Sequence, residues 1–314
     1  YTIQFFEPVR ELARIFAEFQ SAQASAERII SLIEIEPDIK DDEKIIKKYG
    51  DIFEPKTKKW PKIKGNITFE NVTFSYEEGE AILKNFNLNV QAGQTIALVG
   101  ETGSGKSTIV NLVCRFYEPT EGKIMIDGVD YRKRPLQWLH SNLGYVLQTP
   151  HLFSGTIKEN IRYGKLDAMD EEIIKAAKLV NAHDFIMSLK DGYDTDVGEG
   201  GSRLSTGQKQ LISFARAVLS NPSIFILDEA TSSIDTETEQ IIQNAISKVL
   251  KGRTSFIIAH RLSTIREADR ILVIKNGNII EEGNHYQLLK KKGYYYRLYT
   301  NQFVEEQEAI LLNA

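Results

Sequence analysis

The sequence predicts an α/β protein: a core of parallel strands alternating with helices, an antiparallel β portion, a helical subdomain, and a further helix at the N-terminus. Three observations support this prediction. Almost wholly apolar runs at 95–99, 223–227 and 254–259 are typical of strands buried on both faces of a sheet. Helical patterns alternate with these runs along the chain, which indicates parallel strands. Short strand-like segments fill 63–92, and the pattern of residues 151–220 is mostly helical.

Residues 1–35 are predicted to form an amphipathic helix. No stretch of the sequence reaches the roughly 18 apolar residues that a membrane span needs. Residues 36–62 contain several Asp, Lys and Pro residues and are expected to form a linker. The hydrophobic residues of the predicted helix recur at roughly helical spacing, with polar residues between them: Phe5, Val9, Leu12, Ile15, Phe16, Phe19, Ala22, Ala26, Ile29 and Ile30.

The composition is that of a globular protein. Of the 314 residues, 42% are hydrophobic and 26% are charged, and the chain is long enough to bury a large core. The formal net charge of −4 argues against a nucleic-acid partner, because binding to a phosphate backbone favours basic surfaces. The single cysteine, Cys114, excludes a disulfide within the chain and is expected to be a small core residue.

The most informative motif is a loop at residues 100–107, which spell G-E-T-G-S-G-K-S. A strand-like run precedes it and a helical pattern follows, which is the context that a phosphate-binding G-x-x-x-x-G-K-S loop requires. Its backbone N–H groups would face phosphate, Lys106 would add a positive charge, and the Ser107 hydroxyl would bind magnesium. The residues predicted to contact a nucleotide here are Gly100, Glu101, Thr102, Gly103, Ser104, Gly105, Lys106, Ser107 and Thr108.

A second motif, L-S-T-G-Q at residues 204–208, resembles the L-S-G-G-Q signature of the ATP-binding cassette (ABC) ATPases. Thr206 stands where the family has glycine, whereas Ser205 and Gly207 match. The resemblance implies that these two residues, together with Gln208, complete the ATP site of a partner chain. Taken alone, Ser205 would equally suit the N-cap of the helix predicted to follow.

Further motifs follow in the family's order. Asp228 and Glu229 come directly after the apolar run at 223–227. The resemblance makes Asp228 the aspartate that holds magnesium and Glu229 the base that orients or deprotonates the attacking water. His260 follows the run at 254–259 and resembles the histidine that bonds the γ-phosphate. An acidic pair or a histidine after a strand is ordinary by itself, so these roles rest on the order of the motifs.

Three more residues complete the predicted ATP site. Gln148 ends a strand-like stretch and resembles the Q-loop glutamine, which reaches magnesium and the water. Tyr76 resembles the aromatic residue that stacks on adenine, although an aromatic residue in an alternating strand also suits core packing. Asp235 resembles the D-loop aspartate, which crosses the dimer interface. The predicted catalytic residues are Glu229, His260, Gln148 and Lys106, and the predicted magnesium ligands are Ser107, Gln148 and Asp228.

The resemblance covers roughly residues 63–300 and implies a P-loop NTPase (RecA-like) core with an antiparallel β subdomain and a helical signature subdomain at about 151–220. Residues 301–314 would form a C-terminal tail. Within the family, the chain is most similar to bacterial exporters of the multidrug or lipid type. Residues 195–200 resemble the exporter X-loop, which contacts the coupling helices. Residues 1–35 resemble the cytoplasmic end of an exporter's last transmembrane helix; the alternative is a helix packed on its own domain or on a twin chain.

The resemblance implies an ATPase that binds ATP and Mg²⁺. Two chains would enclose two ATP molecules, the partner being an identical chain or a sister subunit, and dimerisation would drive the transmembrane domain of the same transporter. The sequence opens with Tyr1 rather than Met. We therefore expect a piece of a longer membrane protein, soluble by itself, that works at the cytoplasmic face of the cell membrane.

Three other functions fit parts of the sequence. An ABC ATPase of DNA repair or chromosome maintenance would carry long coiled coils, and none lies between Gln148 and Leu204. A free-standing ATPase subunit of an importer would share the motifs, but the N-terminal helix and the X-loop argue against it. A non-hydrolysing module that only dimerises around ATP would be expected to lack Glu229 or His260, and both are present.

Overall fold

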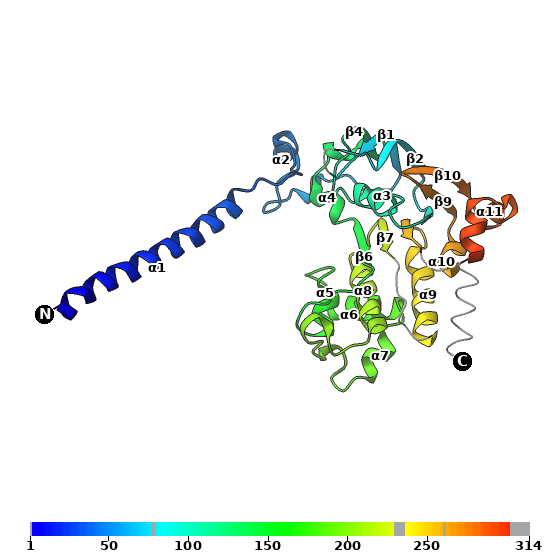
Figure 1. The fold of residues 1–314 in the computed structure, drawn as a ribbon. Helices are drawn as coiled ribbons and strands as arrows, with labels where there is room; N and C mark the ends of the chain where they lie inside the picture. The colour runs from blue at the N-terminus through cyan, green and yellow to red at the C-terminus, as the bar shows by residue number, and fades with distance from the viewer. Residues whose placement is uncertain (1, 77–78, 229–235, 260–261, 302–314) are drawn as a thin grey trace. The chain divides into compact units, whose positions relative to one another are not determined.

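The structure is a computed structural model that describes most of the chain: residues 2–76, 79–228, 236–259 and 262–301 (Figure 1). The chain divides into two compact units, Tyr1–Lys40 and Asp41–Ala314.

The first unit is a single long helix, α1 (Thr2–Glu34), so the predicted N-terminal helix is confirmed. Its side chains from Phe5 onward are exposed, which is typical of a segment that packs against another surface. No helix in the described part of the chain is both long enough and apolar enough to cross a membrane. The exposed large hydrophobic residues of α1 are Phe5, Phe6, Val9, Leu12, Ile15, Phe16, Phe19, Ile29, Ile30, Leu32 and Ile33.

The strands of the second unit form two sheets, a smaller antiparallel one in the order β2-β1-β4-β5 and a larger one in the order β10-β9-β3-β8-β7-β6. In the larger sheet only β10 is antiparallel to its neighbour. The predicted parallel core and antiparallel β portion are confirmed. The strands are β1 (Ile67–Phe74), β2 (Leu83–Val90), β3 (Thr95–Val99), β4 (Glu121–Ile126), β5 (Val129–Asp130), β6 (Leu143–Val146), β7 (Ile224–Asp228), β8 (Thr254–Ile258), β9 (Arg270–Lys275) and β10 (Asn278–Gly283).

Helices cover the larger sheet and build a subdomain beyond its β6–β7 edge, where α5 to α8 lie together (Figure 1). The helices of this subdomain are α5 (Ile157–Arg162), α6 (Asp170–Leu179), α7 (His183–Ser188) and α8 (Thr206–Leu219), with the 3-10 turns η3 (Gly192–Asp194) and η4 (Glu199–Gly201). The remaining helices are α2 (Glu43–Tyr49), α3 (Lys106–Val113), α4 (Leu136–His140), α9 (Thr236–Leu250), α10 (Leu262–Glu267) and α11 (His285–Lys291), with the turns η1 (Thr57–Lys59) and η2 (Tyr131–Lys133).

The central sheet is buried on both faces, and successive residues of β3 enter different cores. Ile96 and Leu98 pack with α3 and the antiparallel sheet, whereas Ala97 and Val99 pack with the helical subdomain and α9. This two-sided burial explains why the strands are continuous apolar runs rather than alternating ones. Cys114 is fully buried, as expected of a core residue.

Residues 36–62, predicted as a linker, contain α2 and η1. From Asp41 onward they are held by the second unit. The Asp41 carboxylate accepts hydrogen bonds from the Leu136 backbone N–H, at 3.0 and 3.1 Å, and lies 3.3 Å from an Arg115 nitrogen. The expected linker thus contains a short helix, whose residues Ile45 and Tyr49, one helical turn apart, are both buried.

The turn between β9 and β10 joins the two sheets. Gly277 has φ of +72°, and a Cβ on it would lie 1.8 Å from the backbone oxygen of Ile82, just before β2. Its N–H donates to the backbone oxygen of Ser104 at 2.9 Å. Only glycine permits this approach, so Gly277 holds the antiparallel sheet and the phosphate loop against the edge of the central sheet.

We predict that Gly277→Ala destabilises the chain far more than Gly252→Ala. Gly252 has a similar φ of +79°, but no described atom lies within 4 Å of the position of its Cβ. Gly252→Ala should therefore cost only the left-handed strain, about 1–2 kcal/mol, and Gly277→Ala at least about 3 kcal/mol. Urea unfolding of both variants measures the difference. Equal losses would contradict the close approach.

Candidate nucleotide-binding site

The phosphate loop connects the end of β3 to the start of α3 and passes close to the backbone of β9. A Cβ on Gly100 would lie 2.2 Å from the backbone oxygen of Ile274, in β9. The Ser104 hydroxyl oxygen is buried and has no hydrogen-bond partner among the described residues. A buried polar group without a partner is costly, so the loop has hydrogen-bonding capacity that a bound group would satisfy.

Lys106 begins α3 and lies over the loop. Its ammonium donates to the backbone oxygens of Gly100 at 2.7 Å and Glu101 at 2.8 Å, and the residue is only 7% exposed. Burial lowers the pKa of Lys106, and the Asp228 carboxylate partly opposes that shift. A partly desolvated ammonium that lies beside the backbone of a Gly-rich loop is suited to bind an anion.

A hollow of about 470 Å³ opens beside this loop. It brings together residues from four places in the sequence that were predicted to share one site. The nucleotide-contacting loop, Tyr76, Gln148 and Asp228 all reach it. Two apolar residues that line it, Ile82 and Ile258, were not predicted. The lining residues are Tyr76, Ile82, Thr102, Gly103, Gly105, Lys106, Ser107, Thr108, Gln148, Asp228 and Ile258.

Parallel pairing of the strands explains how these residues meet. Asp228 ends β7, and Gln148 lies two residues beyond the end of β6, its direct neighbour in the sheet. β8 lies beside β7 and ends at Ile258. The carboxyl ends of parallel strands share one edge, which is where open α/β sheets bind ligands. The predicted residues Glu229, Asp235 and His260 lie outside the described residues.

Tyr76 lines the hollow beside the start of α3. Its hydroxyl lies 3.3 Å from the Thr108 hydroxyl and accepts a hydrogen bond from Asn111 Nδ2 at 3.3 Å, so α3 holds it. Its ring meets Phe74 and Tyr117 edge-on, with centroids 4.9 and 4.8 Å apart. The residue is nevertheless 44% exposed, and it lines the hollow.

Residues 83–232 match the profile of the family described as ABC transporter. The chain contains an ABC transporter domain.

Relatives extend the match to almost the whole chain. An ABC transporter ATP-binding protein of Bacillus subtilis, YfiC, is 49% identical over 303 residues, covering 96% of this chain and 48% of its own length. An ATP-dependent lipid A-core flippase of Syntrophus aciditrophicus is 45% identical over 305 residues, covering 97% of this chain and 49% of its own length. The chain thus spans about half the length of the curated relatives it matches.

Solved structures agree. A bacterial Atm1-family ABC exporter with ATP bound superposes with a TM-score of 0.80 at 38% identity, covering 96% of this chain and 50% of that one. The sheet order, the antiparallel portion and the helical subdomain of this chain are therefore those of an ABC transporter domain.

The signature of this ABC domain does not line the hollow. Ser205 is the N-cap of α8: its hydroxyl accepts from the Gln208 N–H at 3.3 Å, and the Gln208 side chain accepts from the Ser205 N–H at 3.0 Å. Ser205 is exposed, and neither it nor Gly207 is among the residues that line the hollow. Both interpretations of Ser205 are thus compatible, because an exposed capped helix start also presents N–H groups outward.

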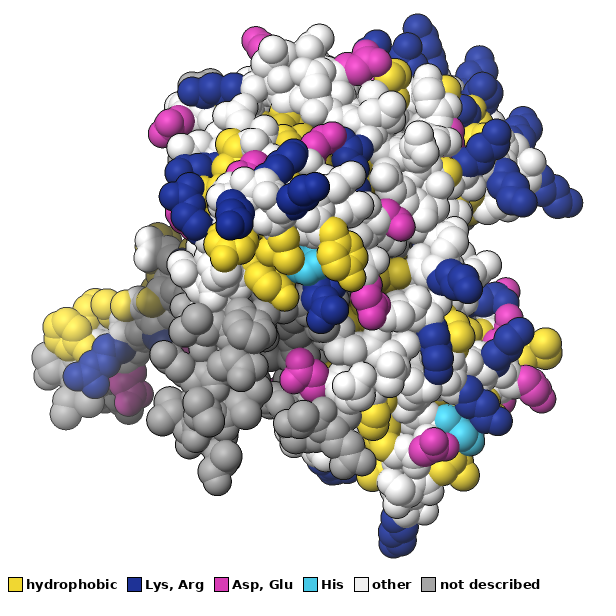
Figure 2. Space-filling view, turned by 90° about the vertical axis from the view of Figure 1, so that its right-hand side faces the viewer, with side chains coloured by type: hydrophobic (Ala, Val, Ile, Leu, Met, Phe, Trp, Pro, Cys, Tyr) yellow, Lys and Arg dark blue, Asp and Glu magenta, His cyan; other side chains and the backbone are white. Residues whose placement is uncertain are grey.

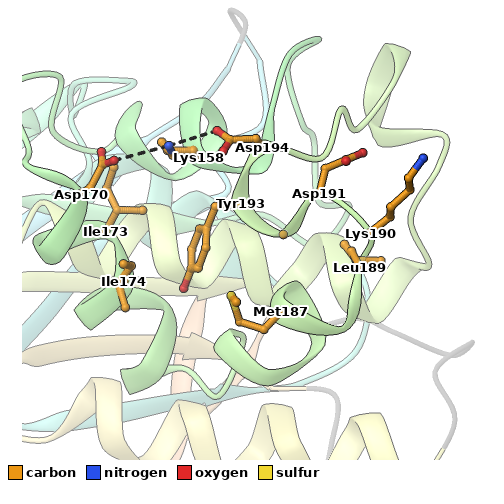
Figure 3. Close-up of a pocket in the computed structure, with 11 residues that line it drawn as sticks. Lys158, Asp170, Ile173, Ile174, Met187, Leu189, Lys190, Asp191, Tyr193 and Asp194 are labelled. Carbon is orange, nitrogen blue, oxygen red and sulfur yellow. Dashed lines mark ion pairs between the residues drawn. The ribbon is translucent and has the colours of Figure 1, made fainter.

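The predicted X-loop is joined to the segment that follows Gln148. Ile157 N–H donates to the Thr195 backbone oxygen at 3.0 Å, and Val197 N–H donates to the Gly155 oxygen at 2.9 Å. Next to this joint, Figure 3 shows Lys158 reaching toward Asp194 in η3 and Asp170 in α6, at 3.0 and 3.4 Å. These three charges lie at the rim of a second hollow in the helical subdomain, which contains no part of the phosphate loop.

An aromatic and basic cluster on the helical subdomain was not predicted from the sequence. The Arg216 guanidinium of α8 donates to the Asn160 and His151 backbone oxygens at 2.9 and 3.1 Å, and to Asn160 Oδ1 at 2.8 Å. It lies 5.2 Å from the Phe153 ring centroid and 5.8 Å from that of Tyr163, and these rings are 44% and 58% exposed. An arginine within an otherwise apolar helix pattern was the signal available.

We predict that Arg216→Met destabilises the domain much more than Lys158→Met. Arg216 is partly buried and donates to part-buried oxygens of Asn160 in α5, so its loss should cost about 2–4 kcal/mol. Lys158 pairs with exposed carboxylates, so its loss should cost less than about 1 kcal/mol. Chemical unfolding of both variants measures the difference in stability. Because methionine replaces a basic residue in each, Lys158→Met is the control for the loss of a positive charge. Similar losses would show that Arg216 is no more than a surface charge.

Proposed function

We propose that this chain is the ATP-binding and ATP-hydrolysing part of an ABC exporter, which couples ATP-driven dimerisation to the movement of a substrate across a membrane. The observation that supports it best is the hollow that joins Lys106, Ser107, Gln148 and Asp228 while leaving the signature on another surface. This division leaves one chain with only part of an ATP site. A second chain is needed to close it.

In this proposal the phosphate loop binds the β- and γ-phosphates of ATP. Lys106 would leave the backbone oxygens of Gly100 and Glu101 for the phosphate oxygens, which are stronger acceptors because they are charged. The Ser104 hydroxyl would gain an acceptor that the described residues do not provide, and the N–H groups of the loop would face the phosphates. Tyr76 would stack on adenine, with Ile82 as an apolar neighbour.

Magnesium fits the polar side of the hollow. Ser107, Gln148 and Asp228 offer a hydroxyl, an amide and a carboxylate, which are oxygen ligands of the kind magnesium binds together with nucleotide phosphates. Among the described residues, no cluster of three or more His, Cys, Asp or Glu side chains could hold a metal by itself. Bound there, magnesium would offset the negative charge at the phosphates.

The remaining catalytic roles follow from position in the sequence. Glu229 comes directly after Asp228, at the end of β7, and would orient or deprotonate the attacking water. His260 follows β8, the neighbouring strand, and would contact the γ-phosphate. Gln148 lies beyond the end of β6, on the other side of β7. The water would thus be reached from three neighbouring strand ends.

The partner would contribute the signature. Ser205, Gly207 and Gln208 of one chain would face the ATP bound by the other, and Asp235 would cross between them. An identical chain or a sister subunit would serve. The assembly would lie at the cytoplasmic face of the membrane, with the transmembrane domain of the same transporter docked on the exposed rings of Phe153 and Tyr163, beside the X-loop.

The exporter is favoured over an importer subunit because the similarity includes the N-terminal segment. The matches to YfiC and to the Atm1-family exporter each cover 96% of the chain. The exposed hydrophobic side chains of α1 would be covered by the transmembrane domain that continues it.

We predict ATP hydrolysis whose rate rises more steeply than linearly with the concentration of the chain, because two chains must meet to complete a site. Removal of magnesium with EDTA should abolish turnover. Phosphate release measured against protein concentration, with and without EDTA, tests both points. A specific rate independent of concentration would contradict the shared site.

We predict that Glu229→Gln keeps ATP binding and traps the dimer. The amide cannot accept the proton of the attacking water, so ATP would stay between the two chains. Size-exclusion chromatography in MgATP should show a dimer for this variant, and phosphate release should fall by at least about 100-fold. Normal turnover would sink the assignment of Glu229 as the base.

We predict that Tyr76→Leu weakens ATP binding by about tenfold, whereas Tyr76→Phe changes it by less than about threefold. Stacking of a base on an aromatic ring contributes about 1–3 kcal/mol, and only leucine removes the ring. Titration with a fluorescent ATP analogue measures both variants. Equal weakening would mean that the hydroxyl bonds to α3 matter and the ring does not.

A further inference from the structure

The phosphate loop carries one acidic side chain, Glu101, in a place where it is electrostatically unfavourable. It is the only Asp or Glu between Gly100 and Ser107. If this loop binds ATP, as the proposed function requires, the carboxylate lies in the same short loop as the groups that hold several negative phosphate charges. Like charges close together repel, and because Glu101 is exposed, water weakens this repulsion without removing it. The structure shows what keeps this carboxylate in place.

The Glu101 carboxylate is bound by a residue far away in the sequence. Tyr294 donates a short hydrogen bond from its hydroxyl to Glu101 Oε1, and this bond raises the pKa of Tyr294. Two cations lie over the same tyrosine ring: Lys275 Nζ is 4.8 Å from its centroid and Arg297 Cζ is 5.7 Å from it. The carboxylate is therefore bound by the hydroxyl of a tyrosine whose ring lies beside two positive charges. Basic side chains are spread over this face of the molecule, the side that carries α11 (Figure 2).

Tyr294 is itself firmly placed. The Glu281 carboxylate, in β10, accepts from the backbone N–H groups of Tyr294 and Tyr295 at 2.5 and 3.0 Å. Tyr295 is 1% exposed, and its hydroxyl lies 2.7 Å from His285 Nδ1 in α11. The segment that carries Tyr294 is thus anchored to the sheet through Glu281 and to the core through Tyr295.

The backbone of Glu101 is held from the other side. Its carbonyl oxygen accepts from Lys106 Nζ at 2.8 Å, while its side chain reaches Tyr294. When Lys106 turns to a phosphate, the contact through the carbonyl is lost and the one through the carboxylate remains. The carboxylate contact is then what keeps the negative charge turned away from the nucleotide.

We propose that Tyr294 is a positioning residue of the ATP site: it binds the Glu101 carboxylate and keeps its charge away from the phosphates. Tyr294 touches neither nucleotide nor metal in this proposal. It acts only through Glu101, so its effect depends on the charge of that residue. It should strengthen ATP binding more than ADP binding, because ATP carries more phosphate charge.

The test is a double-mutant cycle on the chain with Tyr294→Phe, Glu101→Gln and both changes, read by titration with fluorescent ATP and ADP analogues and by KM and kcat. Tyr294→Phe removes one oxygen and keeps the ring. We expect it to raise the dissociation constant for ATP about three- to tenfold, that for ADP less, and to raise KM with kcat unchanged. In the Glu101→Gln background the same change should have no effect, because the amide carries no charge. Tyr296→Phe, on the same segment and more exposed, is the matched control and should bind ATP as the unaltered chain does.

Two results would overturn the proposal. The first is unaltered ATP binding by Tyr294→Phe. The second is an equal loss in the Glu101→Gln background, which would show that Tyr294 acts through the fold and not through the carboxylate. Failure of the proposed function looks different, because the unaltered chain would then bind no nucleotide. A thermal melt of each variant confirms that all are folded.

Discussion

The parallel alignment of strand ends is the constraint on which the rest of the structure depends. β6, β7, β8 and β3 run in the same direction, so the residues that follow each of them arrive at one edge of the sheet. The phosphate loop, Asp228 and Gln148 come from distant parts of the sequence and share a hollow for this reason alone. If one of these strands ran in the opposite direction, the residue that follows it would lie at the opposite edge of the sheet, away from the hollow.

That edge is built around close backbone contacts. Gly100 passes the Ile274 carbonyl and Gly277 passes the Ile82 carbonyl at distances that exclude any side chain. These contacts lock the phosphate loop between the β9–β10 turn and the antiparallel sheet. The loop can therefore present unpaired groups, such as the Ser104 hydroxyl, without collapsing onto itself. Rigid surroundings make such a loop ready to bind an anion.

The helical subdomain has a different design. Its elements are held together by side chains: Arg216 ties α8 to Asn160 in α5 and to His151, and Lys158 links α5 to α6 and η3. The signature begins α8, whose N-cap Ser205 is exposed, while the exposed rings of Phe153 and Tyr163 lie beside Arg216 in the last turn of the same helix. A movement of this subdomain would carry the signature, the X-loop and the exposed rings together, because short hydrogen bonds connect the X-loop to the start of α5.

The sequence by itself determined the class of fold, the phosphate loop and the ABC signature. Apolar runs mark strands buried on both faces, and the loop and signature are local patterns whose chemistry depends on neighbouring residues. It also placed Tyr76, Gln148 and Asp228 in one predicted site. The roles of Glu229, Asp235 and His260 stay predictions, since these residues lie outside the described part of the chain.

Only the tertiary structure decided the contacts between residues far apart in the sequence. The bond from Tyr294 to Glu101 spans 193 positions, and the Arg216 cluster and the Ile82 wall likewise depend on how separate elements pack. Such contacts leave no periodic or local signal, because the chain reveals spacing along its length and not proximity in space.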